Sequence, residues 1–235
     1  MISTLSRRTF FGCACCAAAG LALPRSQARA ATGPRTTLTP DQALAALKEG
    51  NDKFVTDSPV RSVQGRERRL EIARGQTPFA VLVSCSDSRV PPELLFGRGL
   101  GELFIVRNAG NTVDTAALGS IQYAIAELGV PLILVLGHER CGAVDAAVQV
   151  VKNNASFPGA IGQMIEPIVP AVIKAQSQPG DLLDNAVREN VRRVTNRLRT
   201  ASEPILLEPL RAGKLKIVGA RYDLDDGDVD FFDEG

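Results

Sequence analysis

Short apolar runs without a polar interruption constrain the fold of this chain most strongly. Three of them are Phe79–Ser84, Leu103–Val106 and Leu132–Leu136, and Lys216–Tyr222 is a fourth candidate. Runs of this length are typical of strands buried on both faces of a parallel sheet. Helical patterns lie between and after them, at Thr115–Leu128, Ala143–Val151, Ile161–Gln176 and Leu182–Thr200. The alternation predicts an α/β fold with a central, mostly parallel sheet of about four parallel strands flanked by helices.

Both ends of this pattern carry their own signals. Thr39-Pro40-Asp41 predicts the start of a helix that continues to about Phe54, because Thr can cap a helix and Pro suits its first position. Near the C-terminus, Asp226-Gly227 predicts a hairpin turn and one antiparallel edge strand. An apolar fraction of 45% in 235 residues can fill one core. We therefore predict one domain over residues 31–235.

The first thirty residues are expected to lie outside that domain. Arg7-Arg8 precedes an apolar, Ala-rich stretch that runs to Leu23, and Ala28-Arg29-Ala30 has the small-x-small pattern of a signal-peptidase site. The paired arginines look like a twin-arginine export signal over residues 1–30. The apolar stretch is about half of the ~20 residues that cross a bilayer, so it is too short for an anchor. We therefore expect a periplasmic or secreted protein without a membrane anchor after signal removal.

The charge balance and the number of cysteines exclude some classes of function. Lys+Arg number 27 against 26 Asp+Glu, and no basic stripe with interleaved aromatics occurs, so nucleic acid is not an expected partner. Beyond the predicted signal only Cys85 and Cys141 remain. Two cysteines are too few for a disulfide-dense secreted domain. They form either one disulfide or part of one metal site.

The rare metal-binding residues follow two of the predicted strands. Cys85-Ser-Asp87-Ser-Arg89 comes after the first apolar run, and the segment from His138, the single histidine, to Cys141 comes after the third. Functional groups of such sheets gather at the carboxyl ends of the strands. Two thiolates and an imidazole suit Zn²⁺, and three ligands with a free fourth position are typical of a catalytic site. A disulfide between the two cysteines is the structural alternative, but it assigns no role to His138, Asp87 or Arg89.

These motifs carry a family resemblance. Cys85-Ser-Asp-Ser-Arg-Val90 and Gly137-His-x-x-Cys-Gly142, together with Phe104–Asn111 and Gly219–Leu224, closely resemble the β-class carbonic anhydrases. The resemblance extends from about Thr39 to Phe232. It implies reversible hydration of carbon dioxide to bicarbonate and a proton, by an enzyme with one Zn²⁺ per subunit.

The resemblance also implies roles for single residues. Cys85, His138 and Cys141 correspond to the zinc ligands. Asp87 and Arg89 correspond to a catalytic dyad in which Arg holds Asp toward the metal site, and Asp87 released from Arg89 can become a fourth ligand in a closed state.

Further positions match the family's narrow substrate pocket, namely Gln76, Phe104, Ala109, Tyr123 and Gly142. Some of these come from the neighbouring subunit in the family, which implies a homodimer or a tetramer. Gln76 and Tyr123 favour the plant-like branch with an open site. The regulated bacterial branch has Trp three residues before the first Cys, whereas this chain has Leu82 there and no Trp at all. The noncatalytic bicarbonate site of that branch is therefore expected to be absent.

Two other functions fit parts of this pattern. A zinc hydrolase of the same family shape, acting on carbon disulfide or carbonyl sulfide, would keep the same ligands and differ in access to the pocket. A noncatalytic binding protein stabilised by zinc would be expected to show a fourth Cys or His ligand. The chain beyond residue 30 has no such residue.

Overall fold

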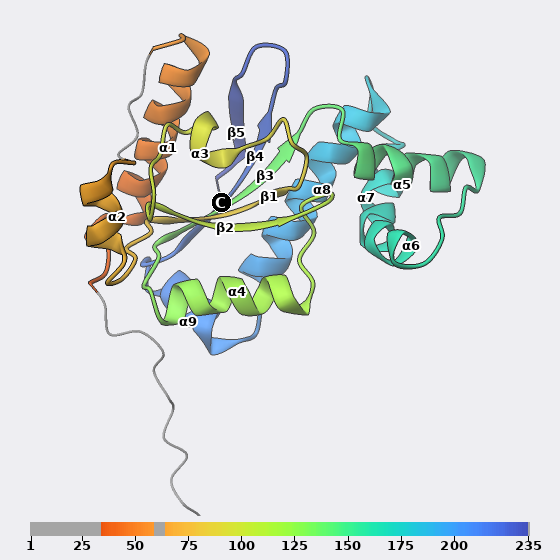
Figure 1. Ribbon diagram of the computed structural model, residues 1–235. Helices are drawn as coiled ribbons and strands as arrows, with labels where there is room; N and C mark the ends of the chain where they lie inside the picture. The colour runs from red at the N-terminus through yellow and green to blue at the C-terminus, as the bar shows by residue number, and fades with distance from the viewer. Residues whose placement is uncertain (1–33, 59–63, 235) are drawn as a thin grey trace, which may run out of the picture.

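A five-stranded sheet with the order β2-β1-β3-β4-β5 forms the centre of the fold (Figure 1). The structure is a computed structural model that describes residues 34–58 and 64–234. The predicted signal at residues 1–30 therefore lies outside the described residues. The strands are β1 (Ala80–Cys85), β2 (Leu103–Asn108), β3 (Leu132–His138), β4 (Lys216–Tyr222) and β5 (Val229–Asp233).

Strand direction follows the prediction. β1 pairs in parallel with β2 and with β3, β3 pairs in parallel with β4, and β5 is antiparallel to β4. The predicted fold class, a mostly parallel sheet with one antiparallel edge strand, is confirmed. β1 and β3 are buried along their whole length, which explains their unbroken apolar sequences.

Helices cover both faces of the sheet (Figure 1). α1 and α3 pack on one face, α4, α8 and α9 pack on the other, and α5–α7 gather beside α8. Within the described residues, no helix has the length and apolar character that crossing a membrane requires. The helices are α1 (Pro40–Val55), α2 (Arg66–Ile72), α3 (Pro92–Leu95), α4 (Thr115–Ala126), α5 (Gly142–Asn153), α6 (Ala160–Ile165), the 3₁₀ helix η1 (Glu166–Ile168), α7 (Val169–Ala175), α8 (Leu182–Arg199) and α9 (Pro204–Arg211).

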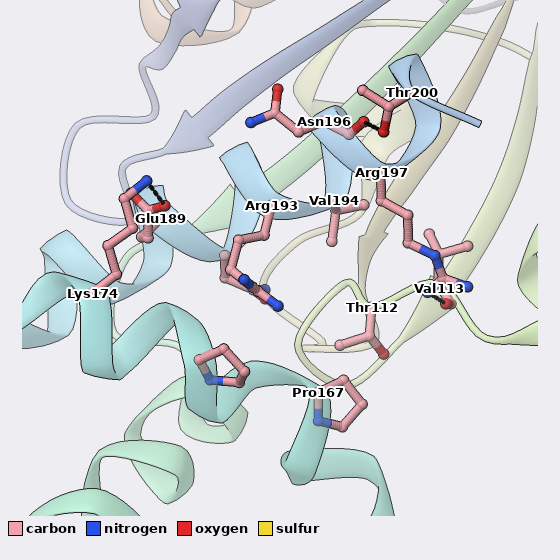
Figure 2. A pocket seen from close by; sticks show the side chains of 12 residues that line it. Thr112, Val113, Pro167, Lys174, Glu189, Arg193, Val194, Asn196, Arg197 and Thr200 are labelled. Atoms are coloured by element: carbon pink, nitrogen blue, oxygen red, sulfur yellow. Dashed lines mark hydrogen bonds and ion pairs between the residues drawn. The ribbon is translucent and has the colours of Figure 1, made fainter. Parts of the chain in front are cut away.

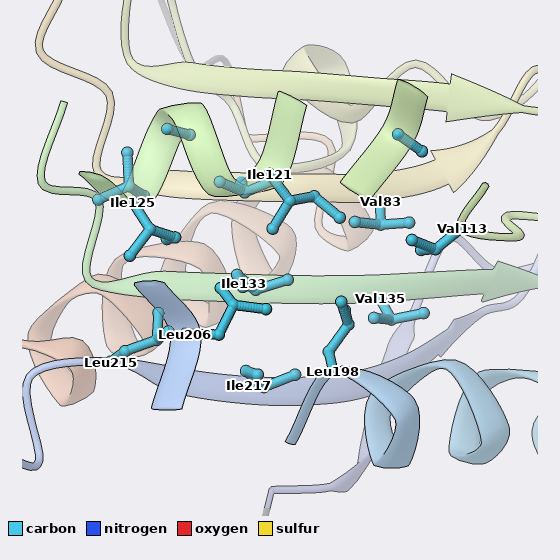
Figure 3. Packing of buried hydrophobic residues seen from close by; sticks show 14 of the residues in the cluster. Val83, Val113, Ile121, Ile125, Ile133, Val135, Leu198, Leu206, Leu215 and Ile217 are labelled. Atoms are coloured by element: carbon cyan, nitrogen blue, oxygen red, sulfur yellow. The ribbon is translucent and has the colours of Figure 1, made fainter. Parts of the chain in front are cut away.

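The core between the sheet and α4, α8 and α9 holds the strand ends in place (Figure 3). Val83 of β1 and Val135 of β3 point into it, and Ile121 of α4 and Leu198 of α8 are fully or almost fully buried against them. The apolar side chains removed from water here are the main source of stability for the central strands. Neighbouring parallel strands are thus fixed with their carboxyl ends together.

The start of α1 is set by a capping box. The Gln42 amide N–H donates to Thr39 Oγ1 at 3.2 Å, and the Thr39 N–H donates to Gln42 Oε1 at 2.9 Å. Pro40 occupies the first helical position. The helix begins where Thr39-Pro40 predicts because these groups satisfy N–H donors that have no partner inside the helix.

The sequence prediction was wrong for one helix and missed two short ones. Ile161–Gln176 is not one helix but α6, η1 and α7, because Pro167 and Pro170 lack the N–H groups that a continuous helix needs. α3 and α9 were not predicted. Both are short, and α9 begins with Pro and contains Pro209, so its sequence carries a weak helical signal.

The connection between β4 and β5 is also longer than a two-residue hairpin. It spans residues 223–228, and Gly227 takes the left-handed φ of +85°. The turn is fastened to α1 by the buried side chain of Asn51. Its Nδ2 donates to the Gly227 carbonyl at 2.9 Å, and its Oδ1 accepts from the Val229 N–H at 2.9 Å.

Replacing Asn51 tests this connection. We expect Asn51→Ala to lower the free energy of unfolding by about 1–3 kcal/mol, because it leaves a buried N–H and a buried carbonyl without partners. Urea denaturation measures the change. Asn153→Ala removes an exposed amide of the same type and is expected to change stability by no more than about 0.5 kcal/mol. Equal stability of the two variants would contradict the assigned role of Asn51.

Candidate metal centre

Three buried side chains meet at the carboxyl edge of the sheet. Cys85 is the last residue of β1, His138 is the last residue of β3, and Cys141 directly precedes α5. Their candidate ligand atoms all lie within 4.8 Å of one another. The parallel neighbours β1 and β3 end at the same edge, so the convergence predicted from strand ends is present.

The spacing of the sulfurs suits a tetrahedral metal ion. Cys85 Sγ and Cys141 Sγ are 3.9 Å apart, and both cysteines are free. Two zinc–sulfur bonds of ~2.3 Å at a tetrahedral angle place the sulfurs about 3.8 Å apart. The alternative of a disulfide between them is therefore not what the structure shows.

The imidazole of His138 is oriented for ligation. Its Nδ1 lies 2.9 Å from the Glu139 carbonyl, which only accepts hydrogen bonds, so Nδ1 carries the proton. The other ring nitrogen, Nε2, is buried and has no hydrogen-bond partner. An unpaired buried nitrogen is destabilising unless a ligand uses it. A backbone carbonyl on one ring nitrogen is also the usual means of fixing a metal-binding histidine.

The two thiols differ in acidity. The Cys141 thiol beside it lowers the pKa of Cys85, and the Gly110 N–H, which donates to Cys85 Sγ at 3.3 Å, lowers it further. The same pairing with Cys85, together with burial, raises the pKa of Cys141. A divalent cation would favour loss of the thiol protons, because metal ligation requires thiolates.

Asp87 and Arg89 form a bidentate ion pair beside this cluster. Arg89 Nε donates to Asp87 Oδ1 at 2.9 Å and Arg89 Nη2 donates to Oδ2 at 2.7 Å. These bonds hold the pKa of Asp87 well below its ordinary value. Asp87 Oδ2 is 3.8 Å from His138 Nε2, so the carboxylate faces the space where the three ligand atoms converge.

Arg107 holds the loop that carries Cys85 and Asp87. From β2, its Nε donates to the Cys85 carbonyl at 2.8 Å and its Nη2 donates to the Asp87 carbonyl at 2.7 Å. Sequence reasoning did not assign Arg107 a role. Its position within the Phe104–Asn111 motif was the available signal.

A second support lies behind Cys85. The buried Asn190 of α8 donates to the Gly110 carbonyl at 2.8 Å, while the Gly110 N–H faces Cys85 Sγ. Nothing in the sequence pattern singled out Asn190. It joins the strand ends only through the tertiary fold.

The predicted pocket residues divide into two groups. Ala109 precedes Gly110 and Gly142 follows Cys141, so both adjoin the metal centre. Phe104 pairs with Val81 at the start of β1, and its ring lies 6.4 Å from that of Tyr123. Gln76 precedes β1. Within one chain, Gln76, Phe104 and Tyr123 therefore lie toward the opposite end of the sheet and are not brought to the metal centre.

Gly110 offers a test of the support behind Cys85. It has a φ of +80°, and a Cβ there would lie 2.5 Å from Ile168 Cδ1 and 3.2 Å from Ala143 Cβ. Gly180 is a matched control, since its φ is +96° and a Cβ would meet no atom within 4 Å. We expect Gly110→Ala to lose about 1–3 kcal/mol more unfolding free energy than Gly180→Ala, because only the former is overpacked.

The same two variants also test how firmly the site holds a metal ion. We expect Gly110→Ala to release bound metal to a chelator faster than the wild type, because the amide next to Cys85 must shift. Gly180→Ala should retain metal as the wild type does. Indistinguishable stability and metal release in the two variants would show that the loop at Gly110 does not support Cys85.

Comparison with known proteins agrees with this geometry. A family model described as carbonic anhydrase matches residues 80–229. Carbonic anhydrase 2 of Mycobacterium tuberculosis is 42% identical over 189 residues, which cover 80% of this chain and 90% of that protein. A carbonic anhydrase of Mycolicibacterium smegmatis is 40% identical over 191 residues, covering 81% and 92%.

Solved structures show the same relationship. The β-carbonic anhydrase of Coccomyxa, in complex with acetazolamide, matches with a TM-score of 0.63 and 27% identity over 80% of this chain and 86% of that one. The β-carbonic anhydrase CafA of Aspergillus fumigatus matches with a TM-score of 0.62 and 26% identity over 83% and 91%. The predicted enzyme class, carbonic anhydrase, is confirmed. The alternative of a noncatalytic binding protein is not what the relatives indicate. This chain belongs to the carbonic anhydrase family, and within it to the β class.

Proposed function

We propose that this protein catalyses the zinc-dependent, reversible hydration of carbon dioxide to bicarbonate and a proton, with one Zn²⁺ per subunit. One observation carries the proposal. Two thiols and an unpartnered imidazole nitrogen converge in a buried position, and an arginine-held carboxylate faces the same position. This donor set is the one that Zn²⁺ prefers.

Three residues are expected to bind the metal ion, and two others to orient the nucleophile. Cys85, His138 and Cys141 would hold the metal. Bound there, zinc would act as a Lewis acid that lowers the pKa of water enough to provide a nucleophile near neutral pH. Asp87, kept ionised by Arg89, offers a carboxylate oxygen that accepts a hydrogen bond from the nucleophile and orients it.

We assign the chain to the plant-like branch with an open site. Both guanidinium contacts to Asp87 are intact, which keeps the carboxylate from turning onto the metal as a fourth ligand. Leu82 is fully buried where the regulated branch has Trp. Both features support an open site without the noncatalytic bicarbonate site.

The dyad gives the first test of this function. We expect Asp87→Asn and Arg89→Ala each to lose most of the carbon dioxide hydration activity, because the nucleophile is no longer oriented, while zinc content stays at one per subunit. Stopped-flow hydration assays and metal analysis measure the two quantities. Ser88→Ala, an exposed residue between them, should keep normal activity. Wild-type turnover in either dyad variant would remove the dyad from the mechanism.

A second copy of the chain is needed to complete the pocket. β2 is an edge strand of the sheet, and the exposed Gln76 and the 38% exposed Tyr123 lie toward its far end. An open sheet edge is a ready surface for pairing with another chain. If the partner's β2 lies antiparallel to this one, its Gln76, Phe104 and Tyr123 approach this metal centre. We therefore propose a homodimer, alone or doubled to a tetramer, as the active form.

Subunit mixing tests this arrangement. A Cys85→Ser chain lacks a metal ligand, and a Gln76→Ala/Tyr123→Ala chain lacks pocket residues, so each alone should have little activity. After joint refolding we expect about a quarter of wild-type activity, since half of the dimers are mixed and one site in each is whole. Activity equal to the average of the two separate variants would show that each chain builds its own site.

We also propose export through a twin-arginine signal at residues 1–30, to the periplasm or outside. The sequence supports it through Arg7-Arg8, the apolar stretch and Ala28-Arg29-Ala30. This route carries folded proteins, so zinc could be bound before the thiols meet an oxidising compartment. We expect Arg7→Lys/Arg8→Lys to leave the protein in the cytoplasm, as cell fractionation would show. Unchanged export of that variant would contradict the assignment.

A further inference from the structure

A cavity of about 530 Å³ lies on α8, away from the three candidate metal ligands. Figure 2 shows α8 on one side of it and the segment that carries Pro167 on the other. Thr112 and Val113 form a third wall. None of Cys85, His138 and Cys141 lines this cavity.

The arginines of α8 differ in whether they form an ion pair with a carboxylate. Of its five, three form ion pairs with carboxylates, namely Arg188 with Asp184 and Asp230, Arg192 with Glu189, and Arg199 with Asp233. Arg193 and Arg197 have no ion pair with a carboxylate among residues 34–58 and 64–234. Both of these line the cavity, one helical turn apart.

Charge around the cavity is unbalanced. Lys174 also lines it, but its Nζ lies 2.5 Å from the buried carboxylate of Glu189. Arg193 and Arg197 therefore leave two positive charges without compensation. Figure 2 shows both side chains leaving α8 on the side of Thr112 and Pro167. Arg197 uses one N–H group on the Val113 carbonyl and keeps others for a ligand.

We propose that this cavity binds a small phosphate-bearing molecule, with the phosphate held by Arg193 and Arg197. A phosphate dianion matches the two uncompensated charges, and the planar guanidinium group matches two of its oxygens. The Thr112 hydroxyl, on the third wall of the cavity, offers a further donor. The volume leaves room for an organic group beyond the phosphate.

The cavity has a structural link to the metal centre. Its wall residue Thr112 donates its N–H to Asn108 Oδ1 at 2.9 Å, and Asn108 Nδ2 donates to the Thr112 carbonyl at 2.7 Å. The same short loop contains Gly110, whose N–H faces Cys85 Sγ. A ligand that contacts Thr112 thus touches the loop that supports a candidate metal ligand.

Calorimetric titration of the full protein with inorganic phosphate, and then with glucose 6-phosphate, tests the proposal. Arg193→Gln is the main variant, because Arg193 makes no ion pair whose loss would unsettle the fold. We expect it to bind both probes about tenfold more weakly, the effect of one lost charged hydrogen bond. Arg211→Gln, with the same change of charge on α9 outside the cavity, should bind as the wild type does.

Four outcomes would overturn the proposal. The first is absence of binding of either probe to the wild type, and the second is equal weakening of binding by Arg193→Gln and Arg211→Gln. The third is weaker binding in Arg89→Gln alone, which would place the anion at the metal centre. The fourth is a changed oligomeric state of Arg193→Gln in sedimentation, which would make the cavity a subunit contact. Carbon dioxide hydration by Arg193→Gln without phosphate should be normal. The phosphate-binding proposal can therefore fail while the proposed function stands, and the two failures can be told apart.

Discussion

The parallel pairing of β1 with β3 is the constraint on which the chemistry of this protein depends. Because both strands are buried on both faces and run in the same direction, their last residues, Cys85 and His138, end at one edge of the sheet. Cys141 reaches the same place because α5 starts there. The apolar core thus determines where a metal can bind.

Around this edge, the supporting contacts differ in kind. Arg107 acts from β2 on two backbone carbonyls, whereas Asn190 acts from α8 on the Gly110 carbonyl behind the sulfur of Cys85. The three ligand residues are buried, but the side chain of Arg89 is 52% exposed. The ligands are held by burial together with hydrogen bonds such as those to the Cys85 carbonyl and to His138, whereas Asp87 is held by an arginine whose side chain solvent can reach.

Much of this was predictable from the sequence, since apolar runs identify buried strands and the rare Cys and His residues follow them directly. The remainder depends on tertiary contacts. The prolines at positions 167 and 170 divide a helical pattern that reads as continuous, and the roles of Arg107 and Asn190 require strands and helices to be in place. The position of Tyr123 far from the metal centre is likewise a tertiary fact, because it follows from the packing of α4 against Phe104 of β2.

The unpartnered Nε2 of His138 affects the stability of the metal-free protein, and through it the rate of degradation in a cell. Burial without a hydrogen bond makes the empty fold less stable by about 1–3 kcal/mol than one in which that nitrogen has a partner. An ion that binds only the native state adds its binding free energy to the stability of the fold. We therefore expect metal-free chains to open more often than metal-bound ones and to be degraded sooner by proteases.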